Sequence, residues 1–415
     1  MRINTDINCS TTADTSDKPA DATRFSGRRA LVFTPVPTHS TTHGNRARVL
    51  GMVQFLTSLG FEVHVAVLQR EGERDETTMK AMFGAQLHLL PYQKPIRRES
   101  TAGRWLRRLK QLFSAESRFS FGVDDWYDDR NDAMLQKLDE SIGFDLAVVE
   151  YVFMSRALLV LRTPRLKVID THDVFANRHR LFLNDGLVPQ FFSTTPDDER
   201  RGLQRADLVL GIQAHETAVL QAYGVNAITF GHTVAVDLLW GSAPTQFDVL
   251  MVGSGNEMNV QGLLWFGREV LPLLIAVHPS LRVAVAGGVC VATPEIQGLL
   301  KLGVVPDLRA VYACTRLAIN PVQSGTGLNI KSVEALGFGM PLLATASGAR
   351  GLEAAQGQAM AVADSPAEFA QAALALLANM DELTQLSRGA QVFAQYWNAA
   401  QTAALVTEFK KSFAT

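Results

Sequence analysis

Hydrophobic positions along the chain follow two alternating patterns. Short apolar runs bounded by glycine, proline and polar residues, such as 28–37, 61–68 and 247–253, are typical of buried strands. Between such runs, residues 49–59 and 260–274 place apolar side chains at helical spacing. A strand, a helix and a second strand form the βαβ unit of a parallel sheet. The pattern therefore predicts an α/β protein.

The series of strands and helices runs once, stops and starts again. Residues 28–235 hold the first series, which closes with a strand at 207–213 and a helix at 214–223. A polar, proline-containing stretch at 230–246 follows neither period and is the predicted linker. Because residues 246–380 repeat the pattern, we predict two doubly wound, Rossmann-like domains with an interdomain cleft.

The two ends of the chain differ from these domains. Residues 381–415 form an amphipathic helical run that contains Trp397 and is expected to cross back to the first domain. Residues 1–27 are rich in Thr, Asp, Ser and Ala and have no apolar block. We expect a disordered tail there rather than a secretory signal.

Composition narrows the class of protein. A hydrophobic content of 47%, a charged content of 19% and a net charge of −2 describe a globular chain without an overall signal for nucleic acid. The three cysteines, Cys9, Cys290 and Cys314, have no zinc or redox spacing, which favours a reducing, cytoplasmic setting. No uninterrupted apolar run reaches the roughly 18 residues that a membrane span needs.

Two charged stretches need separate interpretation. From Ala102 to Ser114, Trp105 shares one helical face with leucine and phenylalanine, while arginine and lysine line the rest. Such a helix suits the anionic inner face of a membrane; the alternative is that it packs on the domain and leaves its charges in water. The acidic cluster 124–129 does not follow an apolar strand, so we interpret it as a solvated loop and predict no metal.

The densest chemical pattern lies at 320–352. An apolar strand at 316–320 is followed by the turn Ser324-Gly325-Thr326-Gly327 and by a helix that starts at Leu328. Unpaired N–H groups at a helix N-terminus beside glycines form an anion site. Lys331 and Glu334 share a helical face; the lysine suits a phosphate and the glutamate a ribose diol. The alternative is a surface Lys–Glu pair on an ordinary helix.

Two loops of the first domain carry further candidates. The loop after the first strand contains His43, Gly44, Asn45 and Arg46, and it lies where open α/β sheets bind ligands; the alternative is a polar loop without a ligand. His172 follows a strand directly and stands between Asp170 and Asp173. A carboxylate partner can hold the protonation and orientation of such a histidine. The alternative is a structural hydrogen-bond network at the strand end.

These stretches resemble retaining GT-B glycosyltransferases of family 4. Residues 325–345, G-T-G-x-x-x-K-x-x-E-A-L-x-x-G-x-P-L-L-A-T, resemble the donor-binding signature of that family, and the loop at Gly44-Asn45 resembles its opening loop. The resemblance implies that Glu334 holds the nucleotide ribose and that His172 approaches the transferred sugar and the phosphates. Many members carry a second glutamate ahead of this one, at the position of Thr326.

The resemblance implies a transferase that moves a sugar from a UDP- or GDP-sugar to a glycan or lipid-linked acceptor with retention, without a cofactor or metal. The alternatives are a non-catalytic nucleotide-sugar-binding protein and a nucleotide-sugar epimerase on the same fold. The implied catalytic residues are His172, Asp173 and Lys331. The implied donor-binding residues are Gly253, Ser254, Ser324, Gly325, Thr326, Gly327, Leu328, Lys331 and Glu334. The implied acceptor or cleft residues are His43, Gly44, Asn45 and Arg46.

Overall fold

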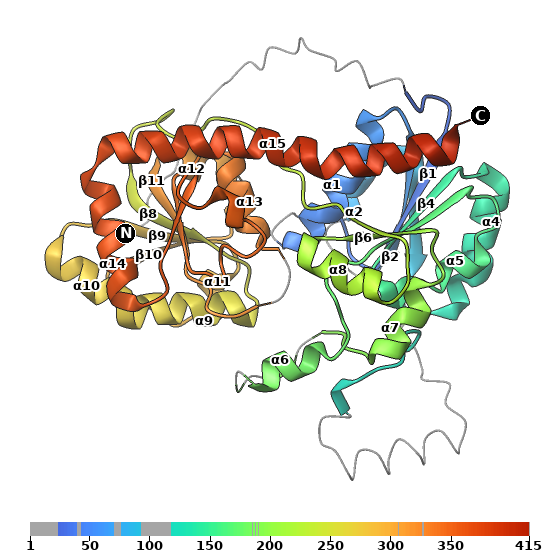
Figure 1. Cartoon of the computed structure of the whole chain (residues 1–415), viewed down its shortest axis with the longest axis horizontal. Helices are drawn as coiled ribbons and strands as arrows, with labels where there is room; N and C mark the ends of the chain where they lie inside the picture. The colour runs from blue at the N-terminus through green and yellow to red at the C-terminus, as the bar shows by residue number, and fades with distance from the viewer. Residues whose placement is uncertain are drawn as a thin grey trace.

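The chain folds into two α/β domains that lie side by side (Figure 1). The computed structural model describes residues 24–39, 43–69, 76–92, 118–184, 186, 188–189, 191–305, 307–325 and 328–414. These residues form two parallel sheets with hydrophobic clusters on both faces of each sheet. The predicted class of two doubly wound domains is therefore confirmed. The basic stretch from Ala102 to Ser114 and residues 1–23 lie outside the described residues.

The N-terminal domain has a seven-stranded parallel sheet in its described part, in the order β3-β2-β1-β4-β5-β6-β7. Its strands are β1 (Arg29–Thr34), β2 (Glu62–Gln69), β3 (Leu87–Pro91), β4 (Leu146–Glu150), β5 (Leu166–Asp170), β6 (Leu208–Gly211) and β7 (Ala227–Thr229). Its helices are α1 (Gly44–Ser58), α2 (Glu76–Phe83), α4 (Asp132–Ile142), α5 (Ala157–Val160), α6 (Arg178–Asn184), α7 (Pro196–Leu203) and α8 (Ala214–Ala222). Short 3₁₀ turns lie at Gly84–Gln86, Asp129–Asn131 and Val152–Met154.

The C-terminal domain has a six-stranded parallel sheet in its described part, in the order β10-β9-β8-β11-β12-β13. Its strands are β8 (Phe247–Val252), β9 (Val283–Ala286), β10 (Leu299–Gly303), β11 (Thr315–Asn320), β12 (Leu342–Ala344) and β13 (Met360–Val362). Its helices are α9 (Glu257–Trp265), α10 (Leu271–Val277), α11 (Val289–Ala292), α12 (Leu308–Ala313), α13 (Ile330–Gly337) and α14 (Pro366–Ala378), followed by α15 (Met380–Phe413). A π-helical turn, Phe266–Val270, joins α9 to α10, and a 3₁₀ turn lies at Glu353–Ala355.

The central strands are buried on both faces, which is why the sequence shows them as continuous apolar runs. In β1, residues 30–33 are completely buried, and alternate side chains enter the hydrophobic clusters on opposite faces of the sheet. Strands covered on both faces read as continuous apolar runs. In each sheet the strand order reverses at such a strand, since β1 lies between β2 and β4, and β8 lies between β9 and β11. Ligands bind at the carboxyl ends of strands at these reversal points.

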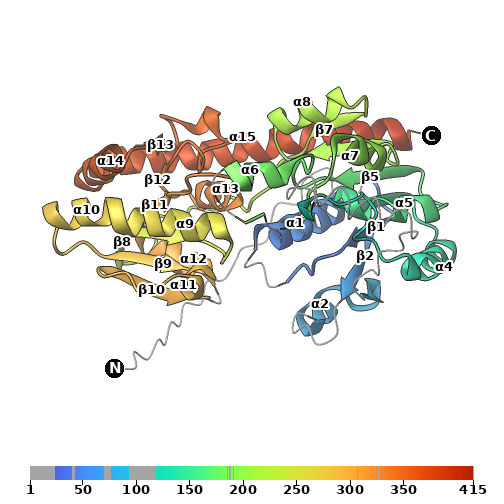
Figure 2. The ribbon, with the colours of Figure 1, turned by 90° about the horizontal axis from the view of Figure 1, so that it is seen from below.

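Helix α15 runs along both domains (Figures 1 and 2). Leu383 and Leu386 near its start belong to the core of the C-terminal domain. Phe409 and Phe413 near its end pack on the N-terminal domain, where they contact Phe25 at ring-centroid distances of 6.0 and 5.9 Å. Phe25 is 4% exposed, although residues 1–27 were expected to form a disordered tail. The order of residues 24–27 follows from the apolar site that α15 builds for this ring.

Two further segments differ from their sequence-based interpretation. The acidic cluster is not a solvated loop: Asp124 pairs with Arg205 at 2.6 Å, and Tyr127 and Asp128 are buried. The helical stretch Glu257–Val277 is long and apolar enough to cross a membrane, with a mean hydropathy of 1.4. Its residues Leu263, Phe266 and Val270 nevertheless belong to the core of the C-terminal domain. The stretch is therefore a core helix of this domain.

Candidate active site between the domains

A cavity of about 360 Å³ opens between the two domains, at the carboxyl ends of their central strands. Its N-terminal wall consists of His43, Gly44, Asn45, Tyr151, His172, Asp173, Phe175, Arg178, Phe191 and Ile212. Its C-terminal wall consists of Ser254, Asn256, Met258, Asn259, Val322, Ser324, Gly325, Leu328, Asn329, Ile330, Lys331 and Ser347. The reversal points of both sheets therefore face the same space.

Most of the predicted site residues that the structure describes line this cavity. They are His43, Gly44, Asn45, His172, Asp173, Ser254, Ser324, Gly325, Leu328 and Lys331. Three others lie close to the cavity but outside its wall. Arg46 turns away and donates to the carbonyl of His39 at 2.8 Å, Gly253 precedes Ser254, and Glu334 lies one helical turn after Lys331. Thr326 and Gly327 lie outside the described residues.

Two helices point their N-termini into the cavity. Gly44 and Asn45 begin α1 in the N-terminal domain, while Asn329 and Ile330 begin α13 in the C-terminal domain. The domains approach closely here, because a Cβ atom on Gly44 would lie 3.1 Å from Cδ1 of Ile330. First-turn N–H groups lack partners within their helix, and the helix dipole adds positive potential. Both walls are thus suited to an anion.

Lys331 and Glu334 form an ion pair beside this anion-binding surface. The Nζ of Lys331 lies 2.6 Å from Oε2 of Glu334, and the two side chains are 13% and 17% exposed. Three residues separate them on one face of α13, as the sequence predicted. A phosphate that reaches Lys331 would therefore compete with the carboxylate for its protons.

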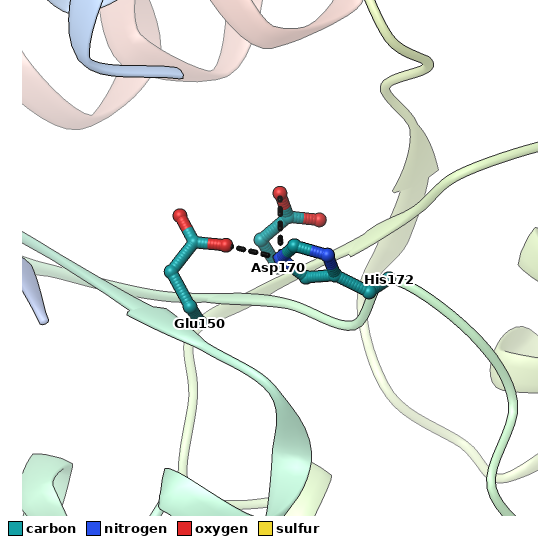
Figure 3. A group of neighbouring side chains, drawn as sticks. All are labelled: Glu150, Asp170 and His172. Carbon is teal, nitrogen blue, oxygen red and sulfur yellow. Dashed lines mark hydrogen bonds and ion pairs between the residues drawn. The ribbon is translucent and has the colours of Figure 1, made fainter. Parts of the chain in front are cut away.

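His172 bonds to a carboxylate that sequence reasoning missed. Its Nε2 lies 2.5 Å from Oε2 of Glu150, the last residue of β4, and 4.0 Å from Oδ2 of Asp170, the last residue of β5 (Figure 3). Asp173 instead pairs with Arg178 at 2.7 Å. Glu150 ends an apolar strand in the same way as Asp170, and this repeated strand-end carboxylate was the available signal.

The turns after β4 and β5 fix the position of this histidine. Tyr151 has a φ of 73° and His172 a φ of 61°, and such positive φ values cost a non-glycine residue about 1–3 kcal/mol. Their rings stack with centroids 4.0 Å apart. Strain of this kind persists where the surrounding structure imposes it, often at functional sites. Here the imposed conformation places the imidazole against both strand ends.

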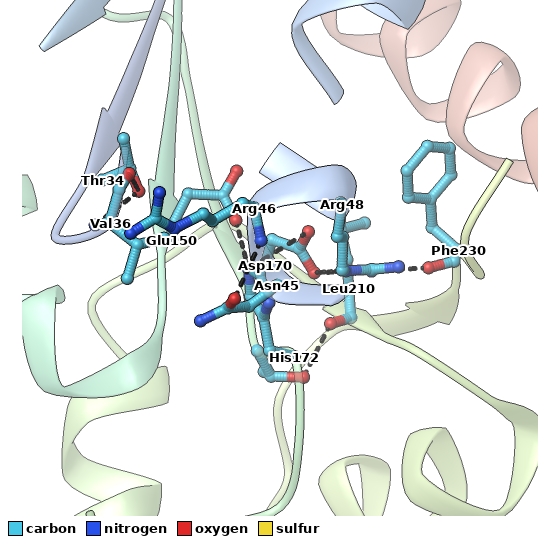
Figure 4. Close-up of polar contacts among 11 residues, drawn as sticks. Thr34, Val36, Asn45, Arg46, Arg48, Glu150, Asp170, His172, Leu210 and Phe230 are labelled. Atoms are coloured by element: carbon cyan, nitrogen blue, oxygen red, sulfur yellow. Dashed lines mark hydrogen bonds and ion pairs between the residues drawn. The ribbon is translucent and has the colours of Figure 1, made fainter. Parts of the chain in front are cut away.

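A buried arginine neutralises part of the negative charge. Nη2 of Arg48, from α1, donates to Oδ1 of Asp170 at 2.6 Å and to the carbonyl of Phe230 at 2.7 Å (Figure 4). Burial, followed by the nearby charge of Asp170, raises the pKa of Glu150. Burial, with Arg48 and Lys331 nearby, lowers the pKa of His232 in the interdomain linker to about 3. The neutral forms of Glu150 and His232 are therefore favoured beside this buried ion pair.

Another buried carboxylate supports the loop after β5. Glu199 accepts hydrogen bonds from the backbone N–H groups of Phe175 at 2.7 Å and Ala176 at 2.9 Å. Burial raises the pKa of Glu199 to about 7. The carboxylate anchors the segment that follows Asp173 and thereby supports this part of the cavity wall.

One group of side chains could hold a metal ion. Within the described parts of the chain, ligand atoms of Glu150, Asp170 and His172 lie within 4.8 Å of one another. Atoms that bind one zinc ion at about 2.0–2.2 Å lie farther apart than the 2.5 Å between Nε2 of His172 and Oε2 of Glu150. This arrangement suits a proton better than a metal. The expected independence from metal remains a prediction.

Comparison with known proteins bears on the chemistry of this cavity. Residues 246–379 match the family model of glycosyl transferases group 1. A sucrose-phosphate synthase from Thermosynechococcus elongatus has the same fold, with a TM-score of 0.64 and 14% identity over 93% of this chain and 100% of that chain. The chain has the GT-B fold, and its C-terminal domain is a glycosyltransferase domain. The enzyme class predicted from the sequence is confirmed, while membership of family 4 and retention stay predictions.

Two other similar proteins add detail. The pneumococcal O-GlcNAc transferase GtfA, solved in complex with UDP and GlcNAc, has a TM-score of 0.63 and 9% identity, over 93% of this glycosyltransferase and 99% of that chain. A curated relative from Klebsiella pneumoniae, described as an uncharacterized 44.6 kDa protein in cps region, is 24% identical over 161 residues. That match covers 36% of this chain and 42% of the relative's length.

Proposed function

We propose that this glycosyltransferase moves a sugar from a UDP- or GDP-sugar to a glycan or lipid-linked acceptor with retention of anomeric configuration. The observation that carries the proposal is the convergence of two helix N-termini and Lys331 on one interdomain cavity. A nucleotide diphosphate is the leaving group that such a positive surface stabilises. The UDP and GlcNAc in the structure of the pneumococcal neighbour support the same class of donor.

The C-terminal wall holds the donor in this proposal. The backbone at Gly325 and Leu328, the first turn of α13 and the ammonium group of Lys331 contact the diphosphate. Glu334 leaves Lys331 and accepts hydrogen bonds from the ribose hydroxyls. These fixed positive groups stabilise the charge that develops on the leaving phosphate, and in this proposal they act without a metal.

The N-terminal wall holds the acceptor. Asn45 and His43 offer polar contacts, while Tyr151 and Phe191 offer aromatic faces on which a sugar ring can stack. His172 and Asp173 lie beside the reacting sugar. The acceptor hydroxyl attacks the anomeric carbon from the face that the diphosphate leaves, and its proton passes to the departing phosphate oxygen. Closure of the two domains excludes water, which protects the donor from hydrolysis.

A panel of nucleotide sugars tests this proposal. The full chain is incubated with each UDP- and GDP-sugar, with and without a glycan mixture, and release of nucleoside diphosphate is measured. We expect release with one donor, an increase when acceptor is added, and a product in which the sugar is bonded to the glycan. Arg282 pairs with Asp248 at the amino end of β8, away from the cavity at the carboxyl end, so the control variant Arg282→Ala should release nucleoside diphosphate as the native protein does.

The other outcomes separate the alternatives. Conversion of the sugar without release of nucleoside diphosphate would identify an epimerase. Binding of a nucleotide sugar without turnover on any acceptor would identify a non-catalytic binding protein. Absence of both binding and release across the whole panel would contradict the proposed donor class.

A further inference from the structure

Each of two adjacent strands of the N-terminal sheet ends in a carboxylate that is followed by an aromatic ring, and these groups lie close together. Glu150 and Asp170 are register partners in the pairing of β4 with β5, and each ends its strand. The rings of Tyr151 and His172 stack just beyond these carboxylates. The proposed transfer assigns a role to His172 but none to Glu150, which is completely buried. A buried acidic group in contact with a histidine that lines a cavity is a candidate functional residue.

The two ring nitrogens of His172 have different surroundings. Nε2 faces Oε2 of Glu150 at 2.5 Å, whereas Nδ1 points away from Glu150 (Figure 3). Among the described residues, Nδ1 has no hydrogen-bond partner, and His172 lines the cavity. The ring therefore has one nitrogen held by Glu150 and one without a partner among the described residues, in a side chain that lines the cavity.

The charges around this pair determine where protons reside. The titratable and charged groups that face it are Arg48 of α1, Asp170 of β5, Tyr151 of the turn after β4 and His232 of the linker. Lys331 of α13 lies near His232. Arg48 is already paired with Asp170. Oε1 of Glu150 is buried without a partner, so an ionised Glu150 would depend on His172 for compensation.

We infer that Glu150 and His172 share one proton between Oε2 and Nε2, so that His172 presents an N–H group at Nδ1 to the cavity. The proton resides either on Glu150, beside a neutral Nδ1–H imidazole, or on Nε2, which makes the ring an imidazolium. Nδ1 carries a hydrogen in both arrangements, and the pair has no net charge in either. Nδ1 of His172 is then a hydrogen-bond donor. Glu150 is the positioning residue that maintains the hydrogen on this nitrogen.

This inference rests on the proposed function for the identity of the acceptor atom. The phosphate oxygens and sugar hydroxyls of a nucleotide sugar all accept hydrogen bonds. A donor at Nδ1 stabilises an oxygen that gains negative charge, whereas a bare Nδ1 would act as a base. Burial of Glu150 and the charge of Asp170, which raise the pKa of Glu150, favour the form with the additional proton.

The tautomer of His172 can be measured directly, without any donor or acceptor. The full chain is labelled with ¹⁵N in its histidine rings, and His172→Gln identifies the resonances of His172. We expect a protonated Nδ1 at pH 7. A neutral ring with hydrogen only on Nε2 would overturn the inference, and so would selective displacement of these resonances by added Zn²⁺. Because this measurement needs no turnover, it is independent of the proposed transfer.

Activity provides a second test through Glu150→Gln. The glutamine amide can donate to Nε2 and so preserve the N–H group at Nδ1 without a shared proton. We expect Glu150→Gln to keep kcat within about threefold, and Glu150→Ala to lower kcat by about tenfold or more. The native protein should lose kcat as rising pH removes the shared proton, and Glu150→Gln should lack this alkaline decline. Equal losses in the two variants, with the decline retained, would contradict the inference.

Glu216→Gln is the matched control. Glu216 is another buried carboxylate near Asp173 and Arg48, and burial raises its pKa to about 8, but its bonding partner is Gln213 rather than His172. The alkaline decline and the His172 tautomer should be unchanged in this variant. Loss of the Nδ1 proton in Glu216→Gln would show that the whole buried charge cluster, and not Glu150, sets the state of the ring.

Discussion

Lys331 and Glu334 form an ion pair with each other, although the proposed function assigns them to different parts of the donor. A diphosphate that binds Lys331 replaces this carboxylate with a more highly charged partner. We expect Lys331→Ala to weaken nucleoside diphosphate binding by about tenfold or more, the order expected for a lost charged hydrogen bond. Isothermal titration calorimetry with UDP and GDP measures the change.

The control for Lys331→Ala is Lys411→Ala on α15. Lys411 also has a glutamate partner three residues away, Glu408 at 2.7 Å, but it is 66% exposed and lies at the end of the chain. Its substitution should leave nucleotide affinity unchanged. If Lys331→Ala binds the nucleotide as tightly as the native protein does, Lys331 does not contact the diphosphate.

Individual site residues differ in how far the sequence could identify them. His172 and Lys331 could be selected because each stands next to a strand end or a helix start, where the local pattern fixes the position. Glu150 could not be assigned to His172, because their contact depends on the register of β4 and β5, 22 residues apart in the chain. Arg46 follows Asn45 on α1, and the rotation of the helix turns its side chain toward His39.

At the scale of elements, boundaries were harder to predict than types. The expected strand at 247–253 corresponds to β8, Phe247–Val252, because apolar runs mark buried strands directly. The expected helix at 49–59 begins earlier, at Gly44, because its first turn, Gly44–Ala47, has no large apolar side chain to continue the helical spacing. The π-helical turn Phe266–Val270 has no signal in the apolar spacing. Gly267 in this turn packs closely on Ile296, a contact between segments that only the fold brings together.

The packing of α15 gives a prediction at this scale. Gly389 lies inside the helix, where alanine would ordinarily stabilise by about 0.5–1 kcal/mol. A Cβ atom on Gly389 would overlap the backbone carbonyl oxygen of Gln358, which is not free to move aside. We therefore expect Gly389→Ala to lower the free energy of unfolding by about 1–3 kcal/mol, as overpacking does. Urea denaturation followed by circular dichroism measures the effect.

Gly51→Ala in α1 is the matched substitution. A Cβ atom on Gly51 would meet only ordinary contacts, the nearest at 3.8 Å from Cε1 of His232 and Oγ1 of Thr233. The helix preference of alanine should then dominate, and the variant should be as stable as the native protein or more stable. Opposite signs for the two substitutions are the expected result. Stabilisation by Gly389→Ala would show that α15 does not pack on the segment at Gln358 as described.

At the scale of the whole molecule, the two domains, the linker and α15 meet at one junction. Trp397 donates to the carbonyl of His232 at 2.7 Å, and Asn398 bonds both the N–H and the carbonyl of Val234. Side chains of the last helix thus hold the backbone that connects the domains. The sequence could predict that residues 381–415 form a helix, but these contacts join residues about 165 positions apart and have no local signal.

His232 makes this junction sensitive to acid. The neutral ring is buried near Arg48 of one domain and Lys331 of the other, and its pKa falls from 6.5 to about 3. Below pH 6.5 the unfolded chain binds a proton that the folded chain does not, so stability falls as pH falls. Relative to the non-titrating variant His232→Gln, we expect the native protein to lose about 2 kcal/mol of unfolding free energy between pH 7.5 and pH 5.0.

Urea denaturation at a series of pH values measures the unfolding free energy of the native protein and of His232→Gln. The contributions of the other titrating groups are the same in both proteins and cancel when one free energy is subtracted from the other. His278, an exposed histidine after α10, provides the control, since His278→Gln should differ from the native protein by a small and constant amount. A difference between native protein and His232→Gln that also stays constant from pH 7.5 to 5.0 would mean that a protonated His232 is tolerated. The ring would then have access to water at the junction, and the two domains would not enclose it.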